Sequence, residues 1–227
     1  MKKYFALFIA SITLILSVVA CKKNAQVVNL NSYNTSSTAL LPLKVGDIWI
    51  YQDSTYDTTN TLKSVIIDTA QVQNQSIVYS DGVPFWQITE TDTSGYGFFG
   101  NIFYTNHPNS YNSPTIYATD TSYKVYFIWG TPTADGAQLT QTSTDFSNLS
   151  CGITGNNYGF TTSYTINGYT NCYKNLYQEQ SCKGITSEVS YFSAGTGLVR
   201  YEIWVEYAGS STPHMIYSQT LTKFIVK

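Results

Sequence analysis

One expected strand carries the residues whose types and spacing are most suggestive of chemistry. In LVRYEIWVEY, residues 198–207, alternation places Arg200, Glu202, Trp204 and Glu206 on one face. Two carboxylates beside a tryptophan are typical of a glycosidase surface. On a strand, however, four residues separate Glu202 from Glu206 by about 13 Å, whereas paired glycosidase carboxylates stand about 5–9.5 Å apart. We therefore expect a solvated face with no catalytic pair, and a possible binding face for a glycan or an envelope protein.

Outside this strand the sequence offers little catalytic chemistry. It has no P-loop, no His-Glu-x-x-His and no Gly-x-Ser-x-Gly. The two histidines, His107 and His214, fall in an expected loop and an expected turn, where we predict surface residues rather than a base or a metal ligand. We predict that the chain is not an enzyme, has no catalytic residue, binds no metal and needs no cofactor.

Composition narrows the class of protein further. The 227 residues include only 11% charged side chains, 20 tyrosines and a formal net charge of -2. A slightly acidic chain with so few basic residues argues against nucleic-acid binding. Abundant Tyr, Thr, Val and Ile favour strands, and tyrosine and tryptophan faces are compatible with sugar contact.

The N-terminus combines a basic start, an apolar run and a cysteine. Lys2 and Lys3 precede an almost wholly apolar stretch, residues 4–19, which is shorter than the roughly 20 residues of a spanning helix. This pattern is typical of a secretory signal peptide, residues 1–20. The run Val18-Val19-Ala20-Cys21 also resembles the lipobox of bacterial lipoproteins; the alternative is an ordinary signal peptide with an incidental cysteine.

The lipoprotein resemblance implies where in the cell the protein is located. Cys21 would become the lipidated N-terminus, carrying acyl chains such as palmitate, and two or more chains anchor a protein stably. Residues 21–40 would hold the lipid and a flexible tether with a span of roughly 25 Å. Since neither an aspartate nor an acidic cluster follows the cysteine, the resemblance implies the outer membrane, with the domain in the periplasm; export to the cell surface stays open.

Three cysteines remain after Cys21. Cys151, Cys172 and Cys182 allow one bridge within the chain, and the periplasm permits disulfides. Cys172 and Cys182 would close a short loop, although Cys151 could pair with either. The spacing matches no zinc pattern, so we expect structural thiols.

Residues 41–227 are predicted to form a single all-β domain, an antiparallel meandering sandwich or a partly open β-barrel. We expect ten or more short strands and no helix, with the first strand in 41–57 and the last at 215–226. Two turn signals favour hairpins: Asp81-Gly82, and Asn167-Gly168, where Ile166 should face Tyr169 and Ser163 should face Cys172. The aromatic run 96–105 is predicted to be a strand with a bulge.

Both ends of this domain resemble uncharacterised Bacteroidetes-type secreted lipoproteins. The resemblance rests on LPLKVGDIWIY, residues 41–51, after the tether, and on YFSAGTGLVRYEI, residues 191–203, near the C-terminus. It covers about thirty-five residues and implies a secreted β-domain without a known shared activity. We therefore expect an outer-membrane lipoprotein serving as a non-enzymatic interaction or binding module. The alternatives are a carbohydrate or lipid carrier with an aromatic-lined pocket, and a glycan hydrolase.

Overall fold

The structure is a computed structural model of the chain. It describes residues 39–227 except for a set of short internal segments, namely 79–83, 92–93, 109–113, 120–124, 131–136, 140–153, 160–163 and 182. Cys21, Cys151 and Cys182, the predicted signal peptide and the turn at Asp81-Gly82 lie outside the described residues.

Every regular element in the described part of the chain is a β-strand. The strands are β1 (Ile48–Tyr56), β2 (Leu62–Val78), β3 (Pro84–Glu90), β4 (Asn101–Pro108), β5 (Pro114–Thr119), β6 (Val125–Gly130), β7 (Ala137–Leu139), β8 (Thr154–Gly159), β9 (Tyr164–Ile166), β10 (Tyr169–Ser181), β11 (Gly184–Ser193), β12 (Gly197–Tyr207) and β13 (His214–Ile225). No helix among the described residues is long and apolar enough to cross a membrane.

One antiparallel sheet contains all thirteen strands. Its order is β6-β5-β4-β3-β2-β1-β13-β12-β11-β10-β8-β7, and β9 pairs with the start of β10. The chain therefore forms two meanders, one from each half, that are joined where the first strand pairs with the last. This arrangement confirms the predicted all-β meander.

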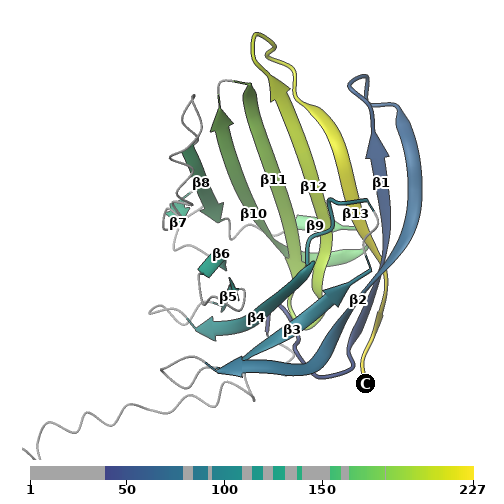
Figure 1. Ribbon diagram of the computed structural model, residues 1–227, viewed down its shortest axis with the longest axis vertical. Coiled ribbons are helices and arrows are strands. Elements are labelled where there is room, and N and C mark those ends of the chain that lie inside the picture. Colours follow the sequence, from purple (N-terminus) through teal and green to yellow (C-terminus); the bar gives the residue numbers. More distant parts are fainter. Residues whose placement is uncertain are drawn as a thin grey trace, which may run out of the picture.

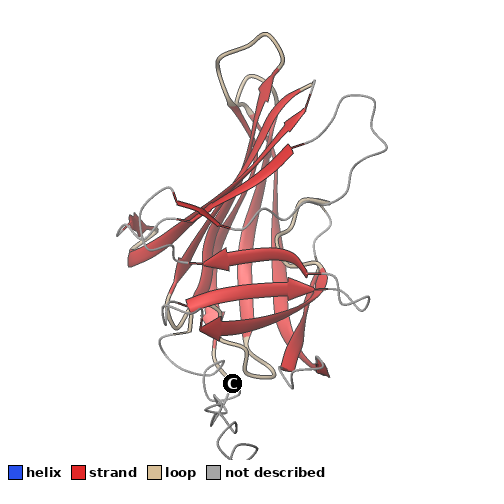
Figure 2. Ribbon diagram, turned by 90° about the vertical axis from the view of Figure 1, so that its left-hand side faces the viewer, coloured by secondary structure: helices blue, strands red, loops and turns tan. Residues whose placement is uncertain are grey.

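The sheet is strongly curved but not closed. The long strands β10 to β13, β1 and β2 stand side by side, while β3 and β4 cross the lower part of the molecule (Figure 1). The view turned by 90° shows one group of strands running across the front of the long ones (Figure 2). The two ends of the sheet approach each other, because β6 comes close to β7 and β8 without pairing with them. The fold is thus a partly open barrel.

The inner face of this sheet holds the hydrophobic core. Trp49 and Tyr51 of β1 project inward and are fully buried. Phe99, from the loop before β4, contacts both rings, with centroids 5.7 Å and 6.2 Å away, and Phe98 meets Tyr201 at 5.2 Å. Residues 94–100 are therefore a loop that plugs the core, and the predicted strand starts only at Asn101. GYGFFG, 95–100, matches Gly-x-Gly-x-x-Gly, but a strand follows it, so no helix N-terminus is available to bind phosphate.

The segment before β1 closes the lower end of the core. Ala39 and Leu40, which the prediction assigns to the tether, are buried in this structure. The buried Asn106 of β4 clamps Leu41: its Oδ1 accepts from the Leu41 amide at 3.1 Å and its Nδ2 donates to the Leu41 carbonyl at 2.5 Å. Gly195 donates to the Ala39 carbonyl at 2.8 Å.

The two sequence segments that resemble lipoproteins meet in space. Trp49 Nε1 donates to the Thr196 carbonyl at 2.6 Å, and Tyr51 Oη donates to the Leu198 carbonyl at 3.0 Å. Gly197 has φ +97°, and a Cβ there would stand 3.0 Å from Trp49 Nε1 and 3.1 Å from Leu41 Cδ1. The Gly-x-Gly turn is therefore required both by its backbone conformation and by the tryptophan packed against it.

The β9–β10 hairpin confirms the predicted turn and one of the two predicted residue pairings. Asn167 and Gly168 have φ values of 51° and 85°, as a type I′ turn requires, and Ile166 faces Tyr169. Cys172, however, faces Tyr164 instead of Ser163. The register shifts between Tyr169 and Cys172, where Asn171 has a positive φ, and one extra residue in β10 moves the pairing by one position.

Candidate functional site

A row of buried polar residues crosses the inner face of the long strands. The row has five members from five neighbouring strands. Each member is paired with the next in the strand register, so all five side chains lie on the same side of the sheet. All five are at most 6% exposed. We call this set the polar row, and its members, from β10 to β1, are Asn175, Ser190, Tyr201, Gln219 and Asp53.

Two acid–tyrosine pairs stand in and beside the polar row. Tyr217 of β13 donates its hydroxyl to Asp53 Oδ2 at 2.7 Å, in a fully buried contact. Tyr201 of β12 donates to Glu188 Oε2 of β11, also at 2.7 Å. Burial raises the pKa of the Glu188 carboxyl. Each carboxylate therefore has a fixed orientation relative to an aromatic ring.

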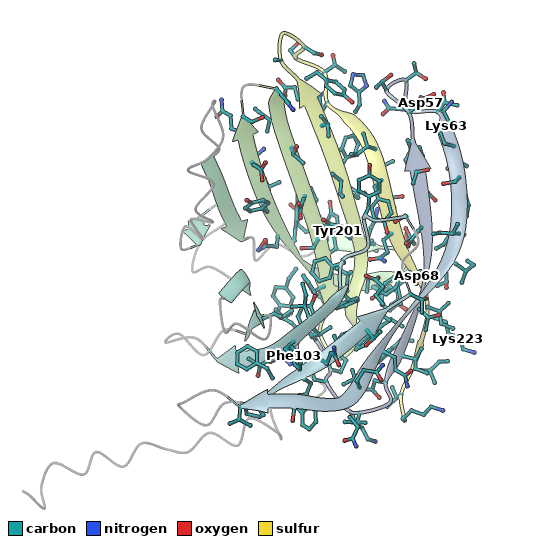
Figure 3. All side chains as sticks on the ribbon, viewed as in Figure 1. Asp57, Lys63, Asp68, Phe103, Tyr201 and Lys223 are labelled. Carbon is teal, nitrogen blue, oxygen red and sulfur yellow. The ribbon has the colours of Figure 1, made fainter. Side chains whose placement is uncertain are left out.

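Three tyrosine rings lie against one another at this place. Tyr217 contacts Tyr201 at a centroid distance of 6.1 Å and an interplanar angle of 67°. On its other side it contacts Tyr96, from the loop before β4, at 5.5 Å and 36°. Tyr96 is 44% exposed, whereas Tyr217 is fully buried, so Tyr96 lies between the Asp53–Tyr217 pair and solvent. In Figure 3, Tyr201 is labelled where the long strands meet the crossing strands.

Glu90, at the end of β3, extends the acidic cluster below the polar row. Its Oε2 accepts from the backbone amides of Phe99 at 2.7 Å and Gly100 at 3.1 Å, and its Oε1 accepts from Gln219 Nε2 at 2.6 Å. Burial, opposed by these hydrogen bonds, raises the pKa of Glu90 to about 8, and the charge of Asp68 adds to the rise. The Glu90 carboxyl is thus poised to be neutral at pH 7.

Asp68 of β2 is a further buried carboxylate of this group, and Figure 3 labels its position. Its Oδ1 accepts from the Thr69 amide at 2.6 Å and from Thr91 Oγ1 at 2.5 Å. Its Oδ2 is buried and has no hydrogen-bond partner among the described residues.

Two buried amide side chains of the polar row also have polar atoms without partners. Neither Oδ1 nor Nδ2 of Asn175 makes a hydrogen bond in the part of the chain that the structure describes, although the residue is only 3% exposed. One amide atom of Gln219 bonds to Glu90, and the other is buried without a partner in the described part of the chain. A buried amide without hydrogen bonds is rare in folded proteins and calls for an explanation.

None of the described basic side chains projects from this inner face. Lys174 and Arg200 face Tyr191 of β11 and therefore project from the opposite side of the sheet to Asn175 and Tyr201. The others lie in loops or turns, at the exposed start of β2, on the outer face of β13 or at the chain end, namely Lys44, Lys183, Lys63, Lys223 and Lys227. Lys63 pairs with Asp57 at 2.8 Å at the tip of the β1–β2 hairpin (Figure 3).

The predicted binding face on β12 is assembled in the structure as a group of mutual hydrogen bonds. Glu202 accepts from Arg200 Nε at 2.5 Å through Oε1 and from Trp204 Nε1 at 3.0 Å through Oε2. Glu202 is only 9% exposed, and Arg200 and Trp204 beside it are half-buried, so this face is not solvated as predicted. Glu206 faces Ile185 near the hairpin tip and does not join the hydrogen-bonded group that the structure describes.

Sequence reasoning located the outer face of β12 but not the polar row. Alternation puts Tyr201 on the face of β12 opposite to Glu202, and it is buried there, but Asp53, Gln219 and Asn175 had no motif to mark them. The sequence did contain one signal, a polar residue on the face that alternation assigns to the core. Asp53 follows Trp49 and Tyr51 at a spacing of two, so it shares their face of the strand. His214, predicted to be a surface residue at a turn, is the first residue of β13 and is half-buried, with a buried Nδ1 that lacks a described partner.

Cys172 is a buried free thiol whose Sγ lies 3.4 Å from the Tyr169 carbonyl. The predicted Cys172–Cys182 bridge assumed a short loop, whereas β10 continues as a strand to Ser181. Nine residues of strand span about 30 Å, far beyond the roughly 7 Å between Cα atoms that a disulfide permits. Cys182 itself lies outside the described residues, and the structure contradicts the short loop on which the pairing depended.

No family model and no curated protein matches this chain. Among solved structures, it is similar to a Bacteroides fragilis protein assigned as exported, with a YmcC-like fold: 11% identity, TM-score 0.41, covering 81% of this chain and 97% of that one. It is also similar to a Parabacteroides distasonis protein assigned as a lipoprotein: 17% identity, TM-score 0.38, covering 83% and 99%. Both likenesses are too distant to transfer a function, so the site is interpreted from this chain's own residues.

Proposed function

We propose that this chain is a lipid-anchored protein of the cell envelope that binds a small polar ligand on the inner face of its curved sheet and catalyses no reaction. The anchor is Cys21, because the N-terminal pattern ends at that cysteine as a lipobox does. The domain then faces the periplasm from the outer membrane, attached through the tether that precedes Ala39.

The observation that carries the binding function is Asn175, whose side-chain amide has no hydrogen-bond partner among the described residues. Leaving a buried amide without hydrogen bonds costs about 1–3 kcal/mol. Leucine at this position would avoid that cost. A side chain that weakens the free protein in this way is explained if a ligand supplies the missing partners.

The outer face of β12 supports a binding function less well. Arg200, Glu202 and Trp204 already satisfy one another's hydrogen bonds, so the group holds the strand together and needs no ligand. On the inner face, by contrast, Glu188 and Tyr177 are only half-buried. We therefore place the approach of the ligand at the end of β10 and β11 that carries these two residues.

Native and denaturing mass spectrometry of the full chain, extracted from its own membrane in a mild detergent, test both parts of the proposal. We expect a polypeptide that begins at Cys21 and carries acyl chains, and a small molecule that the native protein retains. Asn175→Leu should lose this molecule. Gln180→Leu, an exposed position on the opposite face of β10, should keep it.

The denaturing spectrum tests the lipid anchor, and the native spectrum tests the inner-face binding site. A polypeptide that starts at Cys21 without acyl chains would refute the anchor. Equal retention of the small molecule by Asn175→Leu and the wild-type chain would refute the inner-face binding site, and so would a wild-type protein with no bound molecule.

A further inference from the structure

We propose that the ligand is neutral and rich in hydroxyl groups, with a sugar unit held at the β10 end of the polar row against Asn175 and Ser190. This inference rests on the proposed binding function and adds the chemical class of the ligand. The support comes from the two amide atoms of Asn175, from the uncharged residues beside it, and from the acid and the tyrosine at the edge of the site.

The Asn175 amide requires both a donor and an acceptor. Its Oδ1 needs an N–H or O–H group, its Nδ2 needs an oxygen, and neither atom has a partner among the described residues. Because both atoms lack partners, exchanging their positions leaves the same requirement. An ammonium group only donates and a carboxylate only accepts, so each would satisfy one half of the amide. A hydroxyl group or a neutral amide does both.

The neighbours of Asn175 favour hydroxyl groups over an amide. Ser190 faces Asn175 across the β10–β11 pair, and Tyr201 faces Ser190 on β12. Groups that can exchange hydrogen bonds therefore recur at each strand step, about 5 Å apart. A sugar ring carries hydroxyls around its edge and can meet several such groups at once, whereas a single amide group meets only one.

This end of the polar row carries no charge of its own. Asn175, Ser190 and Tyr201 are neutral side chains, and the acid of the row, Asp53, lies four strand steps away on β1, about 19 Å along the sheet. A phosphate or carboxylate would meet none of the described basic side chains here, because those project elsewhere. Burying an anion without a cation is costly, so a neutral ligand fits this place better.

Glu188 and Tyr177 border the site on the side from which we expect the ligand to approach. They face each other across the β10–β11 pair, on the same face as Asn175, and both are half-buried. A carboxylate accepts hydrogen bonds from hydroxyls, and a tyrosine ring offers apolar surface to the C–H groups of a sugar. The residues paired with Asn175 in the sheet are Ser190 and Gly159, so no bulky partner flanks the amide.

Chemical analysis of the molecule that the protein retains tests the ligand class. The full chain is extracted from its own membrane in a polyoxyethylene detergent, so that no detergent sugar enters, and native mass spectrometry measures the retained molecule. Denaturation then releases the molecule, and chromatography after acid hydrolysis identifies its components. We expect a neutral sugar. A single unit identifies a free sugar, and several units identify a segment of an envelope glycan.

Variants then place the sugar on the sheet by titration with the purified molecule. Asn175→Asp keeps the size of the side chain but loses the N–H donor, and it should bind at least about tenfold more weakly. Ser190→Ala should bind about fivefold more weakly, because it loses one hydrogen bond. Ser187→Ala, which removes a hydroxyl from the opposite face of β11, should bind like the wild type. Ser190→Ala reports on the site even if Asn175→Asp fails to fold.

A retained molecule without a sugar unit overturns the ligand class, and the binding function stands if Asn175→Leu loses that molecule. A retained sugar that Ser190→Ala binds as tightly as the wild type overturns the placement at this end of the row. If the wild-type chain retains no molecule, buried water satisfies Asn175, and both the ligand class and the binding function are wrong.

Discussion

Two buried asparagines on the same sheet have opposite surroundings. Asn106, at the lower end, uses both amide atoms to hold the Leu41 backbone. Asn175, in the polar row, uses neither among the described residues. Both are at most 3% exposed, so burial alone does not distinguish them.

The difference separates a structural end from a binding end. At the lower end, Asn106 and Trp49 bind the backbone of distant segments and close the core. In the polar row, side chains of the same chemistry lack such partners and stand beside paired acids and tyrosines. Burial of a polar group is therefore not enough to indicate a ligand. The group must also lack hydrogen-bond partners within the protein.

The largest expected effect comes from removing the structural asparagine. Asn106→Leu leaves the Leu41 amide and carbonyl buried without partners, and we expect it to lower the free energy of unfolding by about 3–5 kcal/mol. Asn175→Leu removes a group that has no partner, so it should be neutral or stabilising in the ligand-free protein. Urea denaturation of both variants measures the contrast, and equal losses would remove the distinction between the two ends.

A second prediction concerns the turn that packs against Trp49. Gly197→Ala combines a positive φ with contacts near 3.0 Å, and we expect a loss of about 2–3 kcal/mol. Gly168→Ala has a similar φ of +85° but open space around the added Cβ, so it should cost about 1 kcal/mol. Thermal unfolding of the pair isolates the packing contribution. Equal losses in the two variants would mean that the Trp49 contact is unimportant.

The pH dependence of stability tests the acidic cluster. Glu90 has an ordinary pKa near 4.5 when unfolded and a pKa of about 8 in the folded chain. Between these values the folded state binds more protons than the unfolded state, so stability falls as pH rises from about 4.5 to 8 and is constant above that. We expect a decrease on the order of a few kcal/mol in the ligand-free wild type.

Glu90→Gln should weaken this pH dependence, because an amide cannot lose a proton in that range and resembles the neutral acid. Urea denaturation at pH 5 and pH 8 compares the two proteins. A variant that loses as much stability between the two pH values as the wild type would show that Glu90 is not the titrating group.

The smallest effect is expected at the outer face of β12. Trp204→Phe removes the N–H that Glu202 accepts but keeps an aromatic ring, so we expect a loss of about 1 kcal/mol and no change in ligand binding. Thermal unfolding checks the stability, and native mass spectrometry of the retained molecule checks the binding. A loss of binding would move the ligand from the inner to the outer face of the sheet.

Local patterns predicted the strands well because alternation and turn residues act over short distances. The first strand, the Asn167-Gly168 turn and the last strand all lie near their predicted positions. Residues 96–100 were misassigned to a strand because an aromatic loop that fills a core has the composition of a strand. The shift at Cys172 depends on one residue with positive φ, Asn171, which no pattern marks.

The polar row could not be predicted in the same way. Its five residues come from five strands, and their alignment depends on the pairing of the first strand with the last. Glu202 and Trp204, in contrast, lie two residues apart on one strand, where alternation alone brings them together. The outer group was therefore accessible from the sequence, and the inner row required the register of the whole sheet.

The most direct test of the binding site is the NMR spectrum of the side-chain amides of the full chain, recorded with and without the small molecule that it retains. The amide signals of Asn175 and Gln219 should shift when the molecule is removed, while those of Asn106 stay in place. Signals of Asn175 that stay in place on removal, or shifts of Asn106 as large as those of Asn175, would contradict the assignment of the polar row as the ligand site.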